Sequence, residues 1–208
     1  MITDRVDNIT RIPEEYRSAL PPAPKSVKIE LTANCDFKCF YCATGSRLRD
    51  KGEIDWDFYC RIVQEMRDAG VEELGVFYLG ESFLYKKLPE AINYAKNVVG
   101  FPYVFLTSNG RMASPERVGD CIEAGLDSLK FSFNYADPAQ CIDITRVDAF
   151  DGVVANIQAV KAIRDEVEAR TGHHCGIYAS SIHYDGEQLE RMKEAIKLVE
   201  PYVDLHYW

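Results

Sequence analysis

The sequence lacks any run of apolar residues long enough to cross a lipid bilayer, which takes about 20 residues. Residues 1–25 carry charges throughout and contain no apolar segment of the length that a secretory signal needs. The sequence therefore argues against membrane-spanning and exported proteins. We expect a cytoplasmic location and no membrane partner.

Positive charge is also scarce. The 208 residues include 24 Lys and Arg against 33 Asp and Glu, which gives a net charge of −9. This balance argues against non-specific binding to nucleic acid, so we expect no nucleic-acid partner. Apolar residues make up 47% of the chain, enough for the core of one large domain.

Cysteine is present at only seven positions, and only three of these lie close together. The segment CDFKCFYC places Cys35, Cys39 and Cys42 with three and then two residues between them. In a reducing cytoplasm, clustered thiols are metal ligands or catalysts before they are disulfides. The cluster therefore predicts a metal centre.

A fourth cysteine near this cluster is missing. Zinc sites usually repeat a pair of ligands elsewhere in the chain, and electron-transfer iron–sulfur clusters use four cysteines. Three protein ligands would leave one metal position open, which is a feature of catalytic sites. The alternative is a zinc site completed by Asp36, His173, His174 or a distant cysteine.

Strand-like and helix-like patterns alternate along the chain after the proline-rich start. We expect strands over residues 26–32, 73–79, 102–107, 127–133, 175–181 and 202–208. We expect helices over residues 55–69, 88–99, 114–124, 151–171 and 186–199, and a short helix around 14–20. This order indicates an α/β fold with parallel strands, either an open sheet or a curved barrel. In both, function lies at the carboxyl ends of the strands.

The cysteine spacing, with the aromatic Tyr41 before Cys42, resembles the signature of the radical S-adenosylmethionine (radical SAM) enzymes. This resemblance implies a partial (β/α)6 TIM-like barrel whose active site lies at the C-terminal mouth. It also implies a 4Fe–4S cluster on Cys35, Cys39 and Cys42. The fourth iron of that cluster would bind S-adenosylmethionine. Reductive cleavage would then give a 5′-deoxyadenosyl radical that abstracts hydrogen from a substrate.

Other strand ends carry further parts of the resemblance. Residues 79–82 (LGES) resemble the Gly-Gly-Glu motif that binds the methionyl ammonium group, with Leu79 in place of the first glycine. Residues 107–110 (TSNG) resemble the family's Thr-Asn-Gly turn, and residues 131–134 (FSFN) its serine-containing fourth strand. The cofactor contacts implied in this way are Tyr41, Gly80, Glu81, Ser108, Ser132 and Arg146.

Each of these positions also has a structural interpretation. Glu81 can cap the turn that follows it, and Asn109 with Gly110 is most simply a turn, because both tolerate positive φ. Ser132 can satisfy a backbone group, and Arg146 can form a surface salt bridge. Tyr41 can serve packing alone.

No catalytic residue follows from the sequence beyond one candidate. Cys141 falls in the loop expected after the fourth strand, where a thiol could donate a hydrogen atom to a substrate radical. Packing is the simpler interpretation of this cysteine.

The resemblance covers residues 26–208, which we expect to form the core domain behind a leader of residues 1–25. The pattern is most similar to the branch whose members carry C-terminal SPASM-type domains with auxiliary clusters and modify peptides, proteins and some sugars. We therefore expect a small-molecule or peptide substrate, or a sugar-like one, and an external electron donor such as flavodoxin or ferredoxin.

The last strand, residues 202–208, is followed by no covering helix. An apolar strand left in this way is usually protected, so we expect that the core continues in a longer protein or is covered by a partner. The rival functional class is a non-catalytic zinc or iron–sulfur module that serves structure or electron transfer. Iron and sulfide content separates the two classes.

Overall fold

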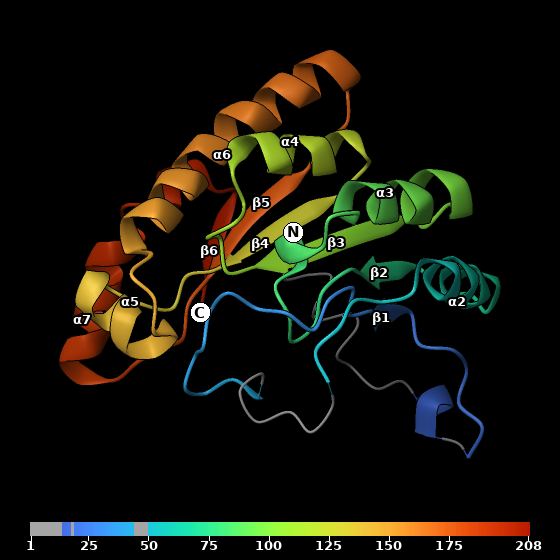
Figure 1. Ribbon diagram of the computed structural model, residues 1–208, viewed down its shortest axis with the longest axis horizontal. Helices are drawn as coiled ribbons and strands as arrows, with labels where there is room; N and C mark the ends of the chain where they lie inside the picture. Colours follow the sequence, from blue (N-terminus) through green and yellow to red (C-terminus); the bar gives the residue numbers. More distant parts are fainter. Residues whose placement is uncertain (1–13, 18, 44–49) are drawn as a thin grey trace.

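The computed structural model describes residues 14–17, 19–43 and 50–208 (Figure 1). Most of the expected leader, residues 1–13 and 18, lies outside the described residues. Of the short helix expected there, residues Glu14–Arg17 form a 3-10 turn (η1).

The centre of the fold is one sheet of six strands in the order β1-β2-β3-β4-β5-β6, with every neighbouring pair parallel. The strands are β1 (Ser26–Lys28), β2 (Glu73–Gly75), β3 (Tyr103–Ser108), β4 (Ser128–Ser132), β5 (Gly176–Ser180) and β6 (Leu205–Tyr207). The predicted α/β fold, a parallel partial (β/α)6 barrel, is confirmed.

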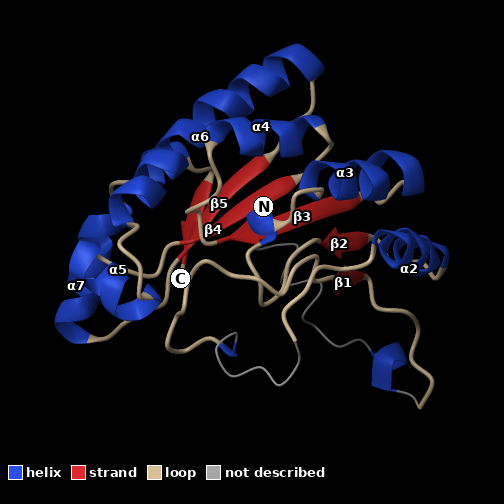
Figure 2. Ribbon diagram, viewed as in Figure 1, coloured by secondary structure: helices blue, strands red, loops and turns tan. Residues whose placement is uncertain are grey.

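Helices connect the strands along one face of the sheet (Figure 2). They are α2 (Trp56–Asp68), α3 (Leu88–Asn93), the π-helical η4 (Tyr94–Val99), α4 (Pro115–Glu123), α5 (Pro138–Thr145), α6 (Phe150–Thr171) and α7 (Gly186–Ile196), with short 3-10 turns η3 (Ser82–Leu84) and η5 (Glu200–Tyr202). Right-handed crossovers that always step in the same direction place all connecting helices on the same face. In the described residues, no helix combines the length and apolar character needed to cross a membrane.

The two faces of the sheet differ in burial. Along β3, Val104, Leu106 and Ser108 are buried, whereas the alternate residues Tyr103 and Phe105 are half-buried. Since side chains alternate across a strand, one face packs against helices and the other lines the concave side of the sheet. We call the face that carries Tyr103 and Phe105 the inner face.

Helices α2 and α4 begin at the capping residues that the sequence predicted. The Asp55 carboxylate accepts the Phe58 N–H at 2.9 Å and begins α2. Ser114 caps α4, with Pro115 in its first turn. The predicted helix 88–99 is continuous, although its second half is the π-helical η4, and Gly100 ends it with φ 81°.

The first strand is shorter than predicted. After β1 ends at Lys28, the Ile29 N–H still bonds to the Gly75 carbonyl at 2.8 Å, but Thr32 pairs antiparallel with Glu53. The chain thus leaves the sheet to pair with a later loop. This turn carries the cysteine segment away from the sheet.

Helix α5 was missed in the sequence. Its N-cap is Asp137, whose carboxylate accepts the Gln140 N–H at 2.9 Å, and Pro138 follows it. An Asp-Pro pair is a helix-start signal that could have located it. The prediction that Cys141 lies in a loop is therefore wrong: it lies in α5, fully buried, and its thiol donates to the Val147 carbonyl at 3.7 Å.

Helix α6 is tied to the end of the sheet by Arg164, which is 6% exposed. Its guanidinium donates to both carboxylate oxygens of Asp204, at 3.0 and 3.1 Å, and to the Cys175 carbonyl at 3.3 Å. Asp204 also accepts the Ile177 N–H at 2.7 Å. The buried guanidinium of Arg164 therefore joins α6 and β5 to the exposed carboxylate of Asp204 in the turn before β6.

We predict that Arg164→Ala lowers the free energy of unfolding by about 2 kcal/mol, because it removes the hydrogen bonds that a buried guanidinium makes to a carboxylate and to a backbone carbonyl. The matched control is Arg170→Ala in the same helix, whose exposed pair with Glu123 contributes less than about 1 kcal/mol. Urea unfolding measures both variants. An equal loss of unfolding free energy in both variants would show that burial of the arginine does not determine how much its ion pair stabilises the fold.

Candidate functional site

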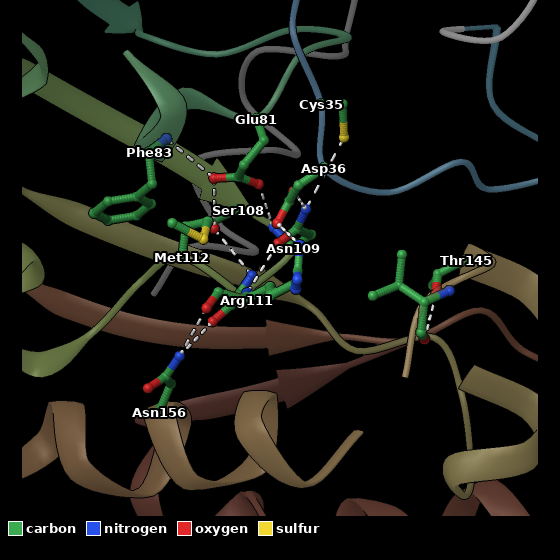
Figure 3. A network of polar contacts seen from close by, with 12 residues as sticks. Cys35, Asp36, Glu81, Phe83, Ser108, Asn109, Arg111, Met112, Thr145 and Asn156 are labelled. Carbon is green, nitrogen blue, oxygen red and sulfur yellow. Dashed lines mark hydrogen bonds and ion pairs between the residues drawn. The ribbon is translucent and has the colours of Figure 1, made fainter. Parts of the chain in front are cut away.

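Several predicted site residues lie at the carboxyl ends of the first four strands, and Figure 3 shows Cys35, Glu81 and Ser108 near one another at this edge. The cysteine segment follows β1, Gly80 and Glu81 follow β2, Ser108 ends β3 and Ser132 ends β4. This is the edge at which parallel α/β folds bind ligands.

The carboxylate of Glu81 is the most enclosed acid of the site, with 3% of the residue exposed. Its Oε1 accepts the Phe83 N–H at 3.1 Å and the Ser108 hydroxyl at 2.9 Å. Its Oε2 accepts the Asn109 N–H at 2.8 Å. The predicted capping role of Glu81 is thus present, and the same carboxylate also joins the end of β2 to the end of β3.

Burial raises the pKa of Glu81 to about 7, because removing a carboxylate from water opposes ionisation more than its three hydrogen bonds favour it. The charge of Asp36 raises that pKa further. The side chain is therefore poised to change its protonation state near neutral pH.

Asn109, which the sequence indicated most simply as a turn residue, connects this acid to the cysteine segment. Its side-chain amide donates to Asp36 Oδ1 at 2.8 Å and lies 4.0 Å from Cys35 Sγ. Asp36 also accepts from Arg111 at 3.1 Å. The end of β3 thereby holds the first cysteine in place.

The turn that follows is fixed to α6. Asn156 donates its amide to the carbonyls of Gly110 and Arg111, at 2.9 and 3.2 Å. Gly110 has φ 85°, and a Cβ there would lie 3.0 Å from Val153. The turn thus requires glycine, as its resemblance to the Thr-Asn-Gly turn suggested.

Gly80 permits the closest backbone contact of the site. A Cβ at this position would lie 1.9 Å from the Thr32 carbonyl oxygen and 2.9 Å from that of Asn34, so no other residue fits without backbone movement. The Gly80 N–H donates to Glu30 Oε1 at 3.1 Å, and the Glu81 N–H donates to Asn34 O at 2.8 Å. The loops after β1 and β2 therefore lie directly against each other.

The cysteine segment is held on its other side by helix α5. The Lys38 N–H donates to the Thr145 carbonyl at 2.9 Å, and the Phe40 N–H donates to the Ile144 carbonyl at 3.2 Å. The last carbonyls of a helix have no partner within it, so the segment between Cys35 and Cys42 satisfies them. This support was not visible in the sequence because α5 was not predicted.

The three clustered thiols are partly buried and form no disulfide. Burial raises the pKa of Cys35 to about 11 and raises that of Cys39, where the charge of Cys42 adds to the effect. Across the described residues, no three ligating side chains are already gathered as a metal site. Binding a metal cluster thus requires these thiols to turn to a common centre and lose their protons.

This segment nevertheless fits an iron–sulfur cluster. Three thiols lie on one short stretch that is anchored at both α5 and the end of β3, and two of them pack against the core. Thiolates are the ligands that such clusters require.

Tyr41 lies at the rim of the site, 47% exposed. Its hydroxyl accepts from the Asn134 side chain at 3.2 Å, and the Asn134 carbonyl in turn accepts from Tyr184 at 2.8 Å. Burial raises the pKa of Tyr41. The aromatic residue before Cys42 is therefore held beside the ends of β4 and β5.

The other predicted cofactor-binding residues differ in how far they are buried. Ser108 is buried against Glu81, and Ser132 is half-buried beside Ser180 at the end of β4. Arg146 is exposed at the end of α5 with φ 63°, the one non-glycine residue with positive φ in the described ranges. It forms no ion pair within the described part of the chain, so the expected surface salt bridge is absent there.

Comparisons with known proteins agree on one family. The family model of the Radical SAM superfamily matches residues 29–165, which include all three clustered cysteines. The PqqA peptide cyclase of Streptomyces rochei is 31% identical over 144 residues, 68% of this chain and 37% of that protein. The GTP 3′,8-cyclase of Chlorobaculum tepidum is 28% identical over 127 residues, 61% of this chain and 38% of that protein. The chain spans less than half the length of these curated relatives.

Solved structures agree on the fold. SuiB of Streptococcus suis, bound to S-adenosylmethionine, matches with a TM-score of 0.65 and 17% identity over 89% of this chain and 38% of its own. Methylornithine synthase (PylB) matches with a TM-score of 0.65 and 14% identity over 88% of this chain and 52% of its own.

The raised pKa of Glu81 predicts a pH dependence of stability. The folded state binds the Glu81 proton more tightly than the unfolded chain, whose pKa is near 4.5. The stabilisation that Glu81 contributes to the folded state is therefore greatest below that pKa and is lost as the pH rises to about 7. Urea unfolding between about pH 5.5 and 7.5 should show this loss in the parent protein and not in Glu81→Gln. The same pH slope in both proteins would contradict the assignment.

We predict that Asn109→Ala loosens the cysteine segment, because it removes the amide that binds Asp36 beside Cys35. Losing this hydrogen bond to a charged group costs about 1.5–3 kcal/mol, and Cys35 should be alkylated faster, as followed by mass spectrometry. Asn97→Ala, which removes an amide bound to Asn93 and Ala124, is the control. Unchanged Cys35 reactivity in Asn109→Ala would refute the anchoring role.

Proposed function

The chain belongs to the radical SAM superfamily, and from this premise we propose that it cleaves S-adenosylmethionine reductively and abstracts hydrogen from a small-molecule or peptide substrate. The superfamily consists of enzymes whose cofactors are a 4Fe–4S cluster and S-adenosylmethionine. When bound, these cofactors supply the radical chemistry, and the protein supplies binding, orientation and exclusion of water.

The observation that carries the proposal is the anchored cysteine segment. Cys35, Cys39 and Cys42 are proposed as the cluster ligands, and they lie between α5 and the Asn109 amide at the ligand-binding edge of the sheet. Three ligands leave one metal position for a cofactor. Holding the segment from both sides would keep the three cysteines near one another for binding the cluster.

Glu81 has a double role in this proposal. A carboxylate offers about four lone-pair sites, and the protein fills three of them. One acceptor site is left for the ammonium group of S-adenosylmethionine, a charge-assisted contact. Ser108 acts through Glu81 as a positioning residue, and Gly80 allows the loops to approach closely enough to form the site.

Three other contacts belong to the proposal. Tyr41, at the rim, would lie against the adenine. Ser132, on the inner edge of β4, would contact the ribose or the carboxylate. Arg146, exposed and without an ion pair in the described residues, would pair with the cofactor carboxylate. No catalytic residue is assigned, and the burial of Cys141 removes the access that a hydrogen donor needs.

The substrate class is proposed from the relatives, which include a peptide cyclase and GTP cyclases. We propose that residues 26–208 form the core domain behind a leader of residues 1–25, in a cytoplasmic enzyme of the SPASM-type branch. An external flavodoxin or ferredoxin would supply the electron. Membership of an enzyme superfamily favours this function over the rival non-catalytic zinc or iron–sulfur module.

We predict that Cys39→Ala abolishes cluster assembly after anaerobic reconstitution, because the loss of one of three ligands leaves an iron without its anchor. Iron and sulfide content and the yield of 5′-deoxyadenosine under reduction measure the effect. The control is Cys60→Ala, which removes a half-buried thiol on α2, away from the segment. Full iron content in Cys39→Ala would refute the proposed ligand set.

A further inference from the structure

Among the buried side-chain oxygen and nitrogen atoms of the described residues, one has no hydrogen-bond partner: the hydroxyl oxygen of Tyr135. The residue is 1% exposed, and it lies between the end of β4 and the start of α5. Buried polar side chains in native proteins nearly always have a partner, and each exception calls for an explanation such as a redox or catalytic role. The proposed function does not use this hydroxyl.

The ring of Tyr135 is fixed by the core. It meets the ring of Phe133 edge to face, with 5.4 Å between centroids, and that of Phe150 at 6.0 Å. Aromatic pairs in this arrangement stabilise each other beyond the area that they bury. The ring therefore has a set position, and its hydroxyl is held inside the protein. A phenylalanine at this position would keep both ring contacts.

The thiol of Cys141 lies near this hydroxyl without satisfying it. It is close enough to affect the pKa of Tyr135, but the two groups form no hydrogen bond of ordinary geometry. Its S–H donates to the Val147 carbonyl at 3.7 Å, and its sulfur lies 3.9 Å from Thr145 Oγ1. Thiol sulfur is a weak acceptor, so the Tyr135 proton is left without a strong acceptor.

The predicted cluster ligand Cys39 lies over the end of α5, the helix that carries Cys141. The N–H groups of Lys38 and Phe40, on either side of it, donate to the carbonyls of the last two residues of α5 at 2.9 and 3.2 Å. Thr145, the last residue of that helix, donates its hydroxyl to the Cys141 carbonyl at 2.7 Å. Cys39 is thus fixed against the same helical turn that Cys141 begins.

The residue before Tyr135 reaches the cysteine segment as well. The side-chain amide of Asn134 donates to the Tyr41 hydroxyl at 3.2 Å. Tyr135 is therefore enclosed between two contacts to this segment, one through Asn134 and one through α5. Burial raises the pKa of Tyr135 well above its ordinary value of 10.0, and the charges of Cys141, Cys39 and Tyr41 add to this rise. The hydroxyl thus keeps its proton at neutral pH, within electrostatic reach of Cys39.

We propose that the Tyr135 hydroxyl donates a hydrogen bond to the Cys39 sulfur when that sulfur ligates the cluster. This inference rests on the proposed function, because it takes Cys39 as a cluster ligand. A cysteine that ligates metal is a thiolate, and hydrogen bonds to ionised acceptors are stronger than those to neutral ones. Binding of the cluster would give the unpartnered proton its acceptor. Tyr135 acts through Cys39 and is a positioning residue.

A donor at this sulfur affects the reduction potential, which in iron–sulfur proteins depends on hydrogen bonds to the sulfurs. The reduced cluster carries one more negative charge than the oxidised one, so the donor stabilises the reduced state more. One electron passes from the external donor to the cluster in this step, and the Tyr135 proton stays on its oxygen. Tyr135 therefore favours the reduction on which cleavage of S-adenosylmethionine depends.

The experiment compares Tyr135→Phe with the parent protein, and Tyr59→Phe is the matched control. Tyr59 is also fully buried, but its hydroxyl donates to the Ala91 carbonyl at 2.7 Å. Each protein is reconstituted anaerobically, and a redox titration followed by electron paramagnetic resonance measures the potential. Tyr135→Phe should bind as much iron as the parent and favour the oxidised state by about threefold, which lowers a one-electron potential by about 28 mV. Tyr59→Phe should keep the parent's potential.

The same three proteins are melted before reconstitution. Tyr135→Phe should then melt at the parent's temperature or above it, because a buried hydroxyl without a partner costs stability. Tyr59→Phe should melt lower, since it loses a buried hydrogen bond. A lower melting temperature for Tyr135→Phe in this state would show that the hydroxyl has its partner within the fold, and it would overturn the proposal.

The two levels of the account fail in different ways. A potential of Tyr135→Phe that equals or exceeds the parent's, at equal iron content, would overturn the role of Tyr135 and leave the proposed function standing. A parent protein that assembles no iron–sulfur cluster would overturn the proposed function and the role of Tyr135 with it.

Discussion

The buried carboxylate of Glu81 is the interaction on which the arrangement of the site depends. It accepts three hydrogen bonds from the turn after β2 and from the end of β3. The Asn109 N–H that it binds belongs to the residue whose side chain reaches Asp36 and Cys35. Glu81 therefore helps to fix the ends of β1, β2 and β3 relative to one another. Because its carboxylate is buried, a change in the charge of Glu81 would disturb this arrangement.

The cysteine segment is positioned by two supports that come from distant parts of the sequence. The end of β3 holds it through Asn109, and the last carbonyls of α5 hold it through Lys38 and Phe40. Backbone groups at a helix end need partners in any case, so the fold satisfies them with the segment that carries the chemistry.

The order of the secondary-structure elements, several helix starts and the family could be predicted from the sequence. Alternating patterns gave the order of strands and helices, caps such as Asp55 and Ser114 gave helix starts, and the cysteine spacing gave the family. The exit of the chain from β1 was not predicted, because Thr32 pairs with Glu53, a long-range contact that periodicity does not reveal. The roles of Asn109 and of α5 also depend on contacts between segments far apart in the chain.

The central claim is that three cysteines hold a cluster with one open iron that binds S-adenosylmethionine. Electron paramagnetic resonance of the reduced, reconstituted protein tests it most directly, with and without S-adenosylmethionine. The account predicts the signal of a reduced 4Fe–4S cluster that changes when S-adenosylmethionine is added, because the cofactor becomes a ligand of one iron. A cluster signal that is identical with and without S-adenosylmethionine, or a protein that binds zinc and no iron, would contradict it.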